Sequence, residues 1–242
     1  MRRMVLAALC LLGALPLQAQ TAAEVMEKHI AALGGREKLA GVKSLMLVGT
    51  MKGMTGADMP VRMFWAARNR LRIEVSIQGN VVVQVFDGST AGSYLTTPST
   101  GRQEPLPITP DEARDLARNA ADFDLTEFLA YDRDGASVEL QGRQPLDGGE
   151  VFKIRWTRRS GDTAVLYIDS KTFLEARQET VVRVRGVEYE TETNSSDFRE
   201  VSGLMVPFRE ESRRKGARQG VVLEFTKVEI NPQIPESAFV KP

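Results

Sequence analysis

The 242-residue sequence is poor in the side chains that most often carry chemistry. It contains one cysteine, Cys10, and one histidine, His29. A single cysteine cannot form an internal disulfide, and a single histidine without a cysteine partner is a poor basis for a zinc site. Glycine-rich phosphate loops, nucleophile elbows and His-Glu-x-x-His patterns are also missing. We therefore expect a protein that is not an enzyme and that uses no cofactor and no metal.

The remaining polar candidates have simpler structural explanations. His29 lies near the apolar face of an expected helix, where a packing histidine is favoured over a ligand. Asp87, Asp169 and Asp197 occur at strand ends or hairpins, where an aspartate side chain hydrogen-bonds the turn backbone. Because no convergent set of acid, base and nucleophile is visible, a barrel-type hydrolase or isomerase is the least favoured class.

An excess of charge of one sign is also missing. The 32 basic residues balance the 32 acidic residues, whereas a nucleic-acid-binding protein usually carries a strong basic excess. The tight basic clusters, Arg158-Arg159 and Arg213-Arg214-Lys215, lie at or next to expected turns. The composition therefore argues against nucleic acid as a partner.

Long hydrophobic runs are absent as well, because a bilayer span needs about 20 apolar residues. The longest run, residues 5–15, follows Arg2 and Arg3 and precedes the small residue Ala19, which is the three-part pattern of a secretory signal peptide. We expect residues 1–19, with Cys10, to be removed on export to the periplasm. Residues 20–242 then remain as a single domain without a transmembrane segment.

Two stretches of the sequence predict helices. Thr21 and Glu24 form a capping box at the start of a helix over residues 21–33, which Gly34-Gly35 ends, and a short helical turn is expected over residues 36–39. A second strong helix start, with Thr109 as the N-cap, predicts a helix over residues 109–121, followed by a short apolar piece. We expect this insert, residues 109–129, to form a lid over the sheet, with these apolar residues facing it: Leu116, Phe123, Leu125, Phe128 and Leu129.

The sequence pattern of the rest of the chain predicts an antiparallel sheet. Short runs with period-two alternation are separated by Gly, Asn and Asp turn signals, and strands at such regular spacing predict an up-and-down meander that curls into an open or closed barrel. The expected strands are 45–51, 61–65, 70–77, 81–86, 138–141, 152–157, 164–168, 176–184, 187–193, 205–212 and 221–230.

A strongly curved sheet needs an apolar filling for its inner face. If the lid fills it loosely, the remaining cavity suits an acyl chain, because each CH₂ group transferred from water gains about 0.8 kcal/mol. Alternation cannot fix which side of a strand faces inward, since a shift of one residue inverts it. The residues that we expect to form the ligand-binding cavity wall are Leu71, Ile73, Val75, Ile77, Val81, Val83 and Val85.

Several short motifs, taken in order, resemble a known superfamily. Tyr167-Ile168-Asp169 is followed by Phe173-Leu174, then by DFREVSGLMVP at residues 197–207, and finally by NPQIPESAF at residues 231–239. Their order and spacing are similar to those of the LolA/LolB-like superfamily. The chain looks closest to the divergent members that are called outer-membrane lipoprotein-sorting proteins.

This resemblance implies a mainly β fold with few helices: a half-open antiparallel β-barrel with an N-terminal helix and a helical lid. It also implies binding of the acyl chains of lipids or lipoproteins in lipoprotein sorting or transport to the outer membrane, with inner- and outer-membrane sorting components as partners. The superfamily's lid-latching arginine corresponds most closely to Arg68, while the tryptophan expected after Asp87-Gly88 is absent. The alternative is an envelope sensor or scaffold of the same fold whose cavity is plugged by its own lid.

Overall fold

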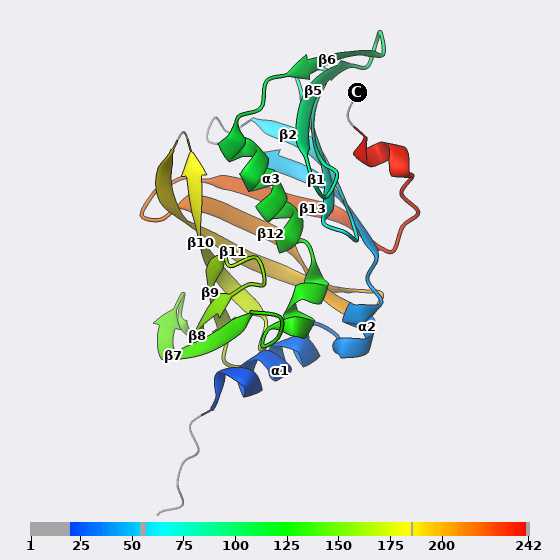
Figure 1. Ribbon diagram of the computed structural model, residues 1–242. Coiled ribbons are helices and arrows are strands. Elements are labelled where there is room, and N and C mark those ends of the chain that lie inside the picture. Colours follow the sequence, from blue (N-terminus) through cyan, green and yellow to red (C-terminus); the bar gives the residue numbers. More distant parts are fainter. Residues whose placement is uncertain (1–19, 54–56, 185, 241–242) are drawn as a thin grey trace, which may run out of the picture.

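The computed structural model describes residues 20–53, 57–184 and 186–240 (Figure 1). The predicted signal peptide, including Cys10, lies outside these described residues. Within them, thirteen strands form one antiparallel sheet. The strands are β1 (Ser44–Lys52), β2 (Asp58–Ala66), β3 (Arg70–Ile77), β4 (Asn80–Phe86), β5 (Ala91–Thr97), β6 (Arg102–Leu106), β7 (Ser137–Leu146), β8 (Gly149–Thr157), β9 (Thr163–Asp169), β10 (Glu175–Val184), β11 (Val187–Val201), β12 (Leu204–Arg214) and β13 (Val221–Ile230).

The sheet is a meander with one long-range closure. Its order is β6-β5-β4-β3-β2-β1-β13-β12-β11-β10-β9-β8-β7, so the first and last strands pair in its middle. Strands β6 and β7 are the two edges, and in the described part of the chain they do not pair with each other. The sheet curls without closing (Figure 1), which confirms the predicted half-open antiparallel barrel.

Two of the strands were not predicted from the sequence. Strand β5 consists of the residues AGSYLTT and β6 of RQEPL, and neither shows an alternation of apolar and polar residues. Most of β6 is exposed, and only Tyr94 of β5 is fully buried. These strands are instead defined by backbone pairing with their neighbours, β5 with β4 and β6 with β5.

The N-terminal helices cover one end of the sheet. Helix α1 (Ala22–Ala32) has the predicted capping box, in which the Thr21 side chain accepts a hydrogen bond from the Glu24 backbone and the Glu24 side chain accepts one from Thr21. Helix α2 (Arg36–Ala40) follows after a sharp turn at Gly34, which has a φ of 122°. A Cβ atom at Gly34 would lie 2.4 Å from the Gly203 carbonyl oxygen, so glycine is required both for the turn and for the close packing.

The connection between β6 and β7 crosses the open side of the curled sheet. It contains α3 (Pro110–Asp122) and the 3₁₀ helix η1 (Leu125–Ala130), and Figure 1 shows α3 lying across the concave side. Thr109 and Glu112 form a second capping box, with Pro110 at the first helical position. A last 3₁₀ helix, η2 (Glu236–Phe239), packs near β3 on the other face.

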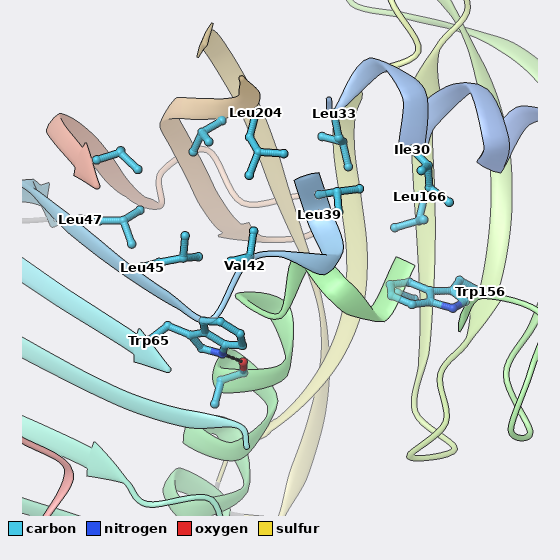
Figure 2. Packing of buried hydrophobic residues seen from close by; sticks show 14 of the residues in the cluster. Ile30, Leu33, Leu39, Val42, Leu45, Leu47, Trp65, Trp156, Leu166 and Leu204 are labelled. Carbon is cyan, nitrogen blue, oxygen red and sulfur yellow. Dashed lines mark hydrogen bonds between the residues drawn. The ribbon is translucent and has the colours of Figure 1, made fainter. Parts of the chain in front are cut away.

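The two faces of the sheet have separate hydrophobic clusters. The larger cluster lies on the concave side and joins α1, α2, the lid segment and both halves of the sheet (Figure 2). Trp65, Ile154 and Leu166 are among its fully buried members. The smaller cluster lies on the outer face, where Val83, Val85, Tyr94 and Phe239 come together.

Candidate functional site

Two hydrogen bonds from the β2–β3 region hold α3 against the sheet. Trp65 Nε1 donates to the Ala120 carbonyl oxygen at 2.8 Å, drawn as the dashed line in Figure 2, and Asn69 Nδ2 donates to the Ala117 carbonyl oxygen at 3.3 Å. Ala120 lies in the last turn of α3, where carbonyl groups lack helical partners. Leu116 and Ala120 are buried beneath the helix, so α3 is held on the sheet by both hydrogen bonds and apolar packing.

Beyond α3, the lid segment fills one end of the concave side, which we call the closed end. The Phe128 ring packs edge-on against His29 at 5.0 Å between centroids and stacks on Trp156 at 5.1 Å. His29 Nδ1 lies 2.8 Å from the Phe173 carbonyl oxygen, and burial lowers the pKa of His29 to about 4. His29 is therefore neutral at ordinary pH, and it packs in the interior, as predicted.

Next to the closed end, a cavity of about 300 Å³ remains between the lid segment and the middle of the sheet. We call this part the cavity end. Its volume is at the lower limit of the roughly 300–1,000 Å³ found for small-molecule sites. The apolar part of its lining comes from β1, β2, β12, β13 and the lid, and consists of Leu45, Leu47, Met63, Phe123, Leu125, Val206, Leu223, Phe225 and Val228.

Two larger hollows lie elsewhere on the molecule. One, of about 570 Å³, lies between α3 and the β8–β9 turn and is lined by several charged residues, among them Arg114, Asp115 and Asp162. The other, of about 720 Å³, lies on the outer face beside the C-terminal segment. Neither has an apolar wall built from both halves of the sheet, so we take the cavity beneath the lid as the candidate site.

Three carboxyl groups line the cavity beside its apolar wall: Asp122 of α3, Glu175 of β10 and Glu210 of β12. Burial raises the pKa of Glu175 to about 7, with further contributions from the negative charges of Asp122 and Glu210. Burial also raises the pKa of Glu210 to about 7, with a contribution from Asp122. By surface area both glutamates are half-buried, and both line the cavity.

A buried arginine connects this acidic group to the lid. The Arg158 guanidinium forms an ion pair with Asp122 at 2.5 Å and lies 3.8 Å from Glu127 of η1. It also lies over the Trp156 ring, 4.7 Å from its centroid. Arg158 is only 4% exposed, and an ion pair withdrawn from water in this way is sensitive to the loss of either partner.

The predicted lid residues all belong to the segment that covers the concave side. Leu116 is buried under α3, Phe123 and Leu125 line the cavity, and Phe128 fills the closed end. Leu129 also packs against the concave cluster. Whether these residues gate a ligand remains a prediction.

The predicted cavity wall needs a correction, because strand register divides it between two faces. Arg72 pairs with Val85, Glu74 with Val83 and Ser76 with Val81, and directly paired residues share a face of the sheet. The three valines therefore lie with the polar side of β3 on the outer face. The residues that face the concave side are Leu71, Ile73 and Val75, whereas Ile77 is 41% exposed.

None of these seven residues lines the 300 Å³ cavity, which lies against β1, β12 and β13 instead. The apolar residues of β3 and β4 do not form a single wall, because alternation within each strand leaves their relative register undetermined. Their register is offset by one residue from the pairing that would align both apolar sets.

Arg68 also lies away from the role that the resemblance assigned to it. Its side chain is exposed in the β2–β3 turn, where its φ is 69°. The hydrogen bonds to α3 come from Trp65 and Asn69 on either side of it. The buried arginine that contacts the lid segment is Arg158, and the sequence pattern of Arg158-Arg159 indicates only a turn.

The acidic residues of the cavity were not predicted from the sequence, although the alternation pattern of β12 contains an indication for one of them, Glu210. On β12 the buried residues Leu204, Val206 and Phe208 alternate along one face. Glu210 is the next residue on that face, so a charged group occupies a position that the pattern assigns to the interior. Such a residue is a candidate for function or for a special partner.

The other polar candidates have structural roles. The Asp87 side chain accepts hydrogen bonds from Ser89 and Thr90, and the Asp169 side chain accepts them from Lys171 and Thr172. In the described part of the chain, no group of three or more His, Cys, Asp or Glu side chains is arranged to hold a metal ion. Of the helices described, none is both long enough and apolar enough to cross a membrane.

The comparisons with known proteins identify this curled, half-open sheet as a LolA-like fold. No protein-family model matches the sequence, and no curated protein matches it significantly. Solved structures do match it. A putative outer-membrane lipoprotein-sorting protein domain from Vibrio parahaemolyticus is 11% identical, with a TM-score of 0.53 over 90% of this chain and 95% of that one.

Two further structures have the same architecture. A LolA superfamily protein from Nitrosomonas europaea is 13% identical, with a TM-score of 0.51 and coverage of 92% of this chain and 99% of that one. A DUF1329 family protein from Desulfovibrio piger is 9% identical, with a TM-score of 0.56 and coverage of 92% and 98%. The chain thus has the LolA-like fold that the motifs predicted.

Proposed function

We propose that residues 20–242 form a single, non-catalytic domain that binds an acyl chain of a lipid or lipoprotein beneath the lid. In this proposal residues 1–19 direct export to the periplasm, and the bound chain is in transit toward the outer membrane. The observation that carries the proposal is the 300 Å³ cavity, which apolar side chains of β1, β12, β13 and the lid segment surround. An acyl chain can bind to these apolar side chains without any polar contact.

Several contacts hold the lid segment on the sheet. The hydrogen bonds from Trp65 and Asn69 to α3 together contribute about 1–3 kcal/mol. The buried side chains of Leu116 and Ala120 and the ion pair between Asp122 and Arg158 add to this amount. A chain that fits the cavity under the closed lid gains about 0.8 kcal/mol for each CH₂ group that it buries.

One structural neighbour supports lipoprotein cargo in particular, since it is described as a putative outer-membrane lipoprotein-sorting protein domain. We therefore extend the proposal to its partners. An inner-membrane sorting component would load the chain, and an outer-membrane component would receive it.

Native mass spectrometry of the protein recovered from the periplasm tests the proposal, with extracted lipids identified afterwards. We expect a population that carries a lipid or acylated peptide. The variant Leu223→Trp, which adds bulk to the cavity wall, should lose this population and the binding of the neutral apolar probe N-phenyl-1-naphthylamine. Leu95→Trp is the matched control, because Leu95 is half-buried on β5 and does not line the cavity.

A protein without bound lipid that also ignores the apolar probe would contradict the proposal. That outcome would favour an envelope sensor or scaffold, in which the packing seen at the closed end extends over the whole concave side. Circular dichroism of each variant shows whether a loss of binding reflects a lost fold.

A further inference from the structure

The lining of the cavity beneath the lid combines two kinds of residue. Apolar residues come from β1, β2 and β13, while what we call the acidic side consists of Asp122, Glu175 and Glu210 together with the neutral polar residues Asn119 and Gln178. The two kinds are neighbours, since Glu210 is paired directly with Leu223. The three carboxyl groups come from α3, β10 and β12, so tertiary folding alone brings them together. A ligand that fills this space therefore meets both apolar surface and acceptor oxygens.

The acidic side has too few positive partners within the protein. Arg158 is the basic group whose charge acts on Glu175, and it is already paired with Asp122 and close to Glu127. Among the described residues, no hydrogen bond or ion pair reaches the Glu175 or Glu210 carboxyl group. Carboxyl groups away from bulk water normally have such partners, so these two remain available to a ligand.

The chemistry of the missing partner follows from the acceptors. An ionised carboxylate only accepts hydrogen bonds, while an ammonium group presents three donors and one positive charge. Glu175 and Glu210 can share such a group, and the hydroxyl groups of Thr193, Ser195 and Ser212 on the same wall can accept any remaining donor. An anionic head group would instead face three carboxyl groups.

We infer that the ligand of this cavity carries a protonated amine beside its apolar chain, with the amine between Glu175 and Glu210 and the chain along Leu45, Leu47 and Leu223. This inference rests on the proposed acyl-chain binding and names the head-group chemistry that goes with it. Arg158 is already paired with Asp122, and the amine would neutralise negative charge on Glu175 and Glu210.

Binding of such a ligand depends on pH in a defined direction. Glu175 and Glu210 each have a pKa of about 7 without ligand, whereas an alkylamine remains protonated, as lysine does with its pKa of about 10.4. Acidification therefore removes the negative charge and leaves the amine. The charged groups that act on Glu175 are Asp122 of the lid, Glu210 and Arg158, and the charged group that acts on Glu210 is Asp122.

The test compares three probes of equal chain length, dodecylamine, dodecanol and dodecanoic acid, by isothermal titration calorimetry at pH 8.0 and pH 5.5. At pH 8.0 we expect dodecylamine to bind about tenfold or more tightly than dodecanol, and dodecanoic acid to bind most weakly. At pH 5.5 the preference for the amine should shrink several-fold, while dodecanol binding stays constant.

The double variant Glu175→Gln/Glu210→Gln should lose the preference for the amine and keep dodecanol binding. It should also be at least as stable as wild type at pH 8.0, since it removes two carboxyl groups whose ionisation burial disfavours. Glu139→Gln, the same change at an exposed position of β7, is the control that should behave as wild type.

The outcomes separate this inference from the proposed function. Equal binding of amine and alcohol by wild type, or an undiminished amine preference in the double variant, would overturn the inference while leaving chain binding intact. Failure of all three probes would overturn both. Two further probes distinguish the source of the amine: lysophosphatidylethanolamine represents an aminolipid, and an acylated peptide with a lysine after its acylated residue represents a lipoprotein.

Discussion

The closed end and the cavity end of the concave side lie under the same lid segment, yet they are filled in opposite ways. At the closed end Phe128, His29 and Trp156 pack ring against ring. At the cavity end the lid presents Phe123 and Leu125 to a space of about 300 Å³ that Glu175 and Glu210 also line. One segment thus serves as core material at one end and as a cover at the other.

The difference between the two ends shows which side chains keep part of a protein interior from being filled. Aromatic rings approach one another closely and gain from doing so. Carboxyl groups repel one another and require donors, so a wall that carries two unpaired carboxyl groups does not collapse onto an apolar lid. Arg158 lies at the border, since its guanidinium covers Trp156 and binds Asp122.

The largest expected effect on stability comes from removing the Arg158 side chain. Arg158→Ala leaves Asp122 and Glu127 without their buried cation, and loss of one partner of a buried pair costs about 3–5 kcal/mol of unfolding free energy. Urea denaturation at pH 7.5 measures it. Arg68→Ala, at the exposed arginine that the sequence suggested as the latch, should change stability by less than about 0.5 kcal/mol. Equal losses for the two variants would contradict the assignment of Arg158.

A matched pair of phenylalanines on the lid tests the comparison directly. Phe128→Ala removes a ring that packs on two others and should cost about 3 kcal/mol of unfolding free energy. Phe123→Ala enlarges a space that already exists, so it should cost less than half as much and should alter binding of the apolar probe instead. A larger stability loss for Phe123→Ala would show that the cavity end is the better packed one.

The third prediction concerns pH and has opposite signs at the two ends. Burial lowers the pKa of His29 from 6.5 in the unfolded chain to about 4. The unfolded state therefore binds the proton first, and stability present above pH 6.5 is lost as the pH falls toward 4, by about 2 kcal/mol between pH 7 and pH 5. Denaturation curves should show that His29→Gln removes this dependence.

At the cavity end, Glu175 and Glu210 act the other way. Their folded pKa of about 7 lies above the unfolded value of 4.5, so the folded state binds protons more tightly and stability falls as the pH rises from 4.5 through 7. The difference between wild type and Glu175→Gln/Glu210→Gln should grow with rising pH over this interval. A difference that is constant with pH would mean that the two carboxyl groups titrate normally.

Local sequence signals were sufficient for much of the architecture. The capping boxes at Thr21 and Thr109 predicted the starts of α1 and α3, because a cap is formed by residues three positions apart. Alternation and turn residues predicted eleven of the strands and their up-and-down connection, but not the break between β6 and β7. The strands it missed, β5 and β6, bury few side chains and therefore carry little pattern.

The candidate site was decided by tertiary structure. Register between β3 and β4 turned Val81, Val83 and Val85 to the outer face, and no periodicity within either strand contains that information. Asp122, Glu175 and Glu210 meet only because β10 and β12 curl toward α3. The sequence by itself determined the elements and the class of fold, since these depend on near neighbours along the chain. The cavity, its acidic side and the Arg158 contact with the lid depend on residues far apart in sequence, and only the curled sheet brings them together.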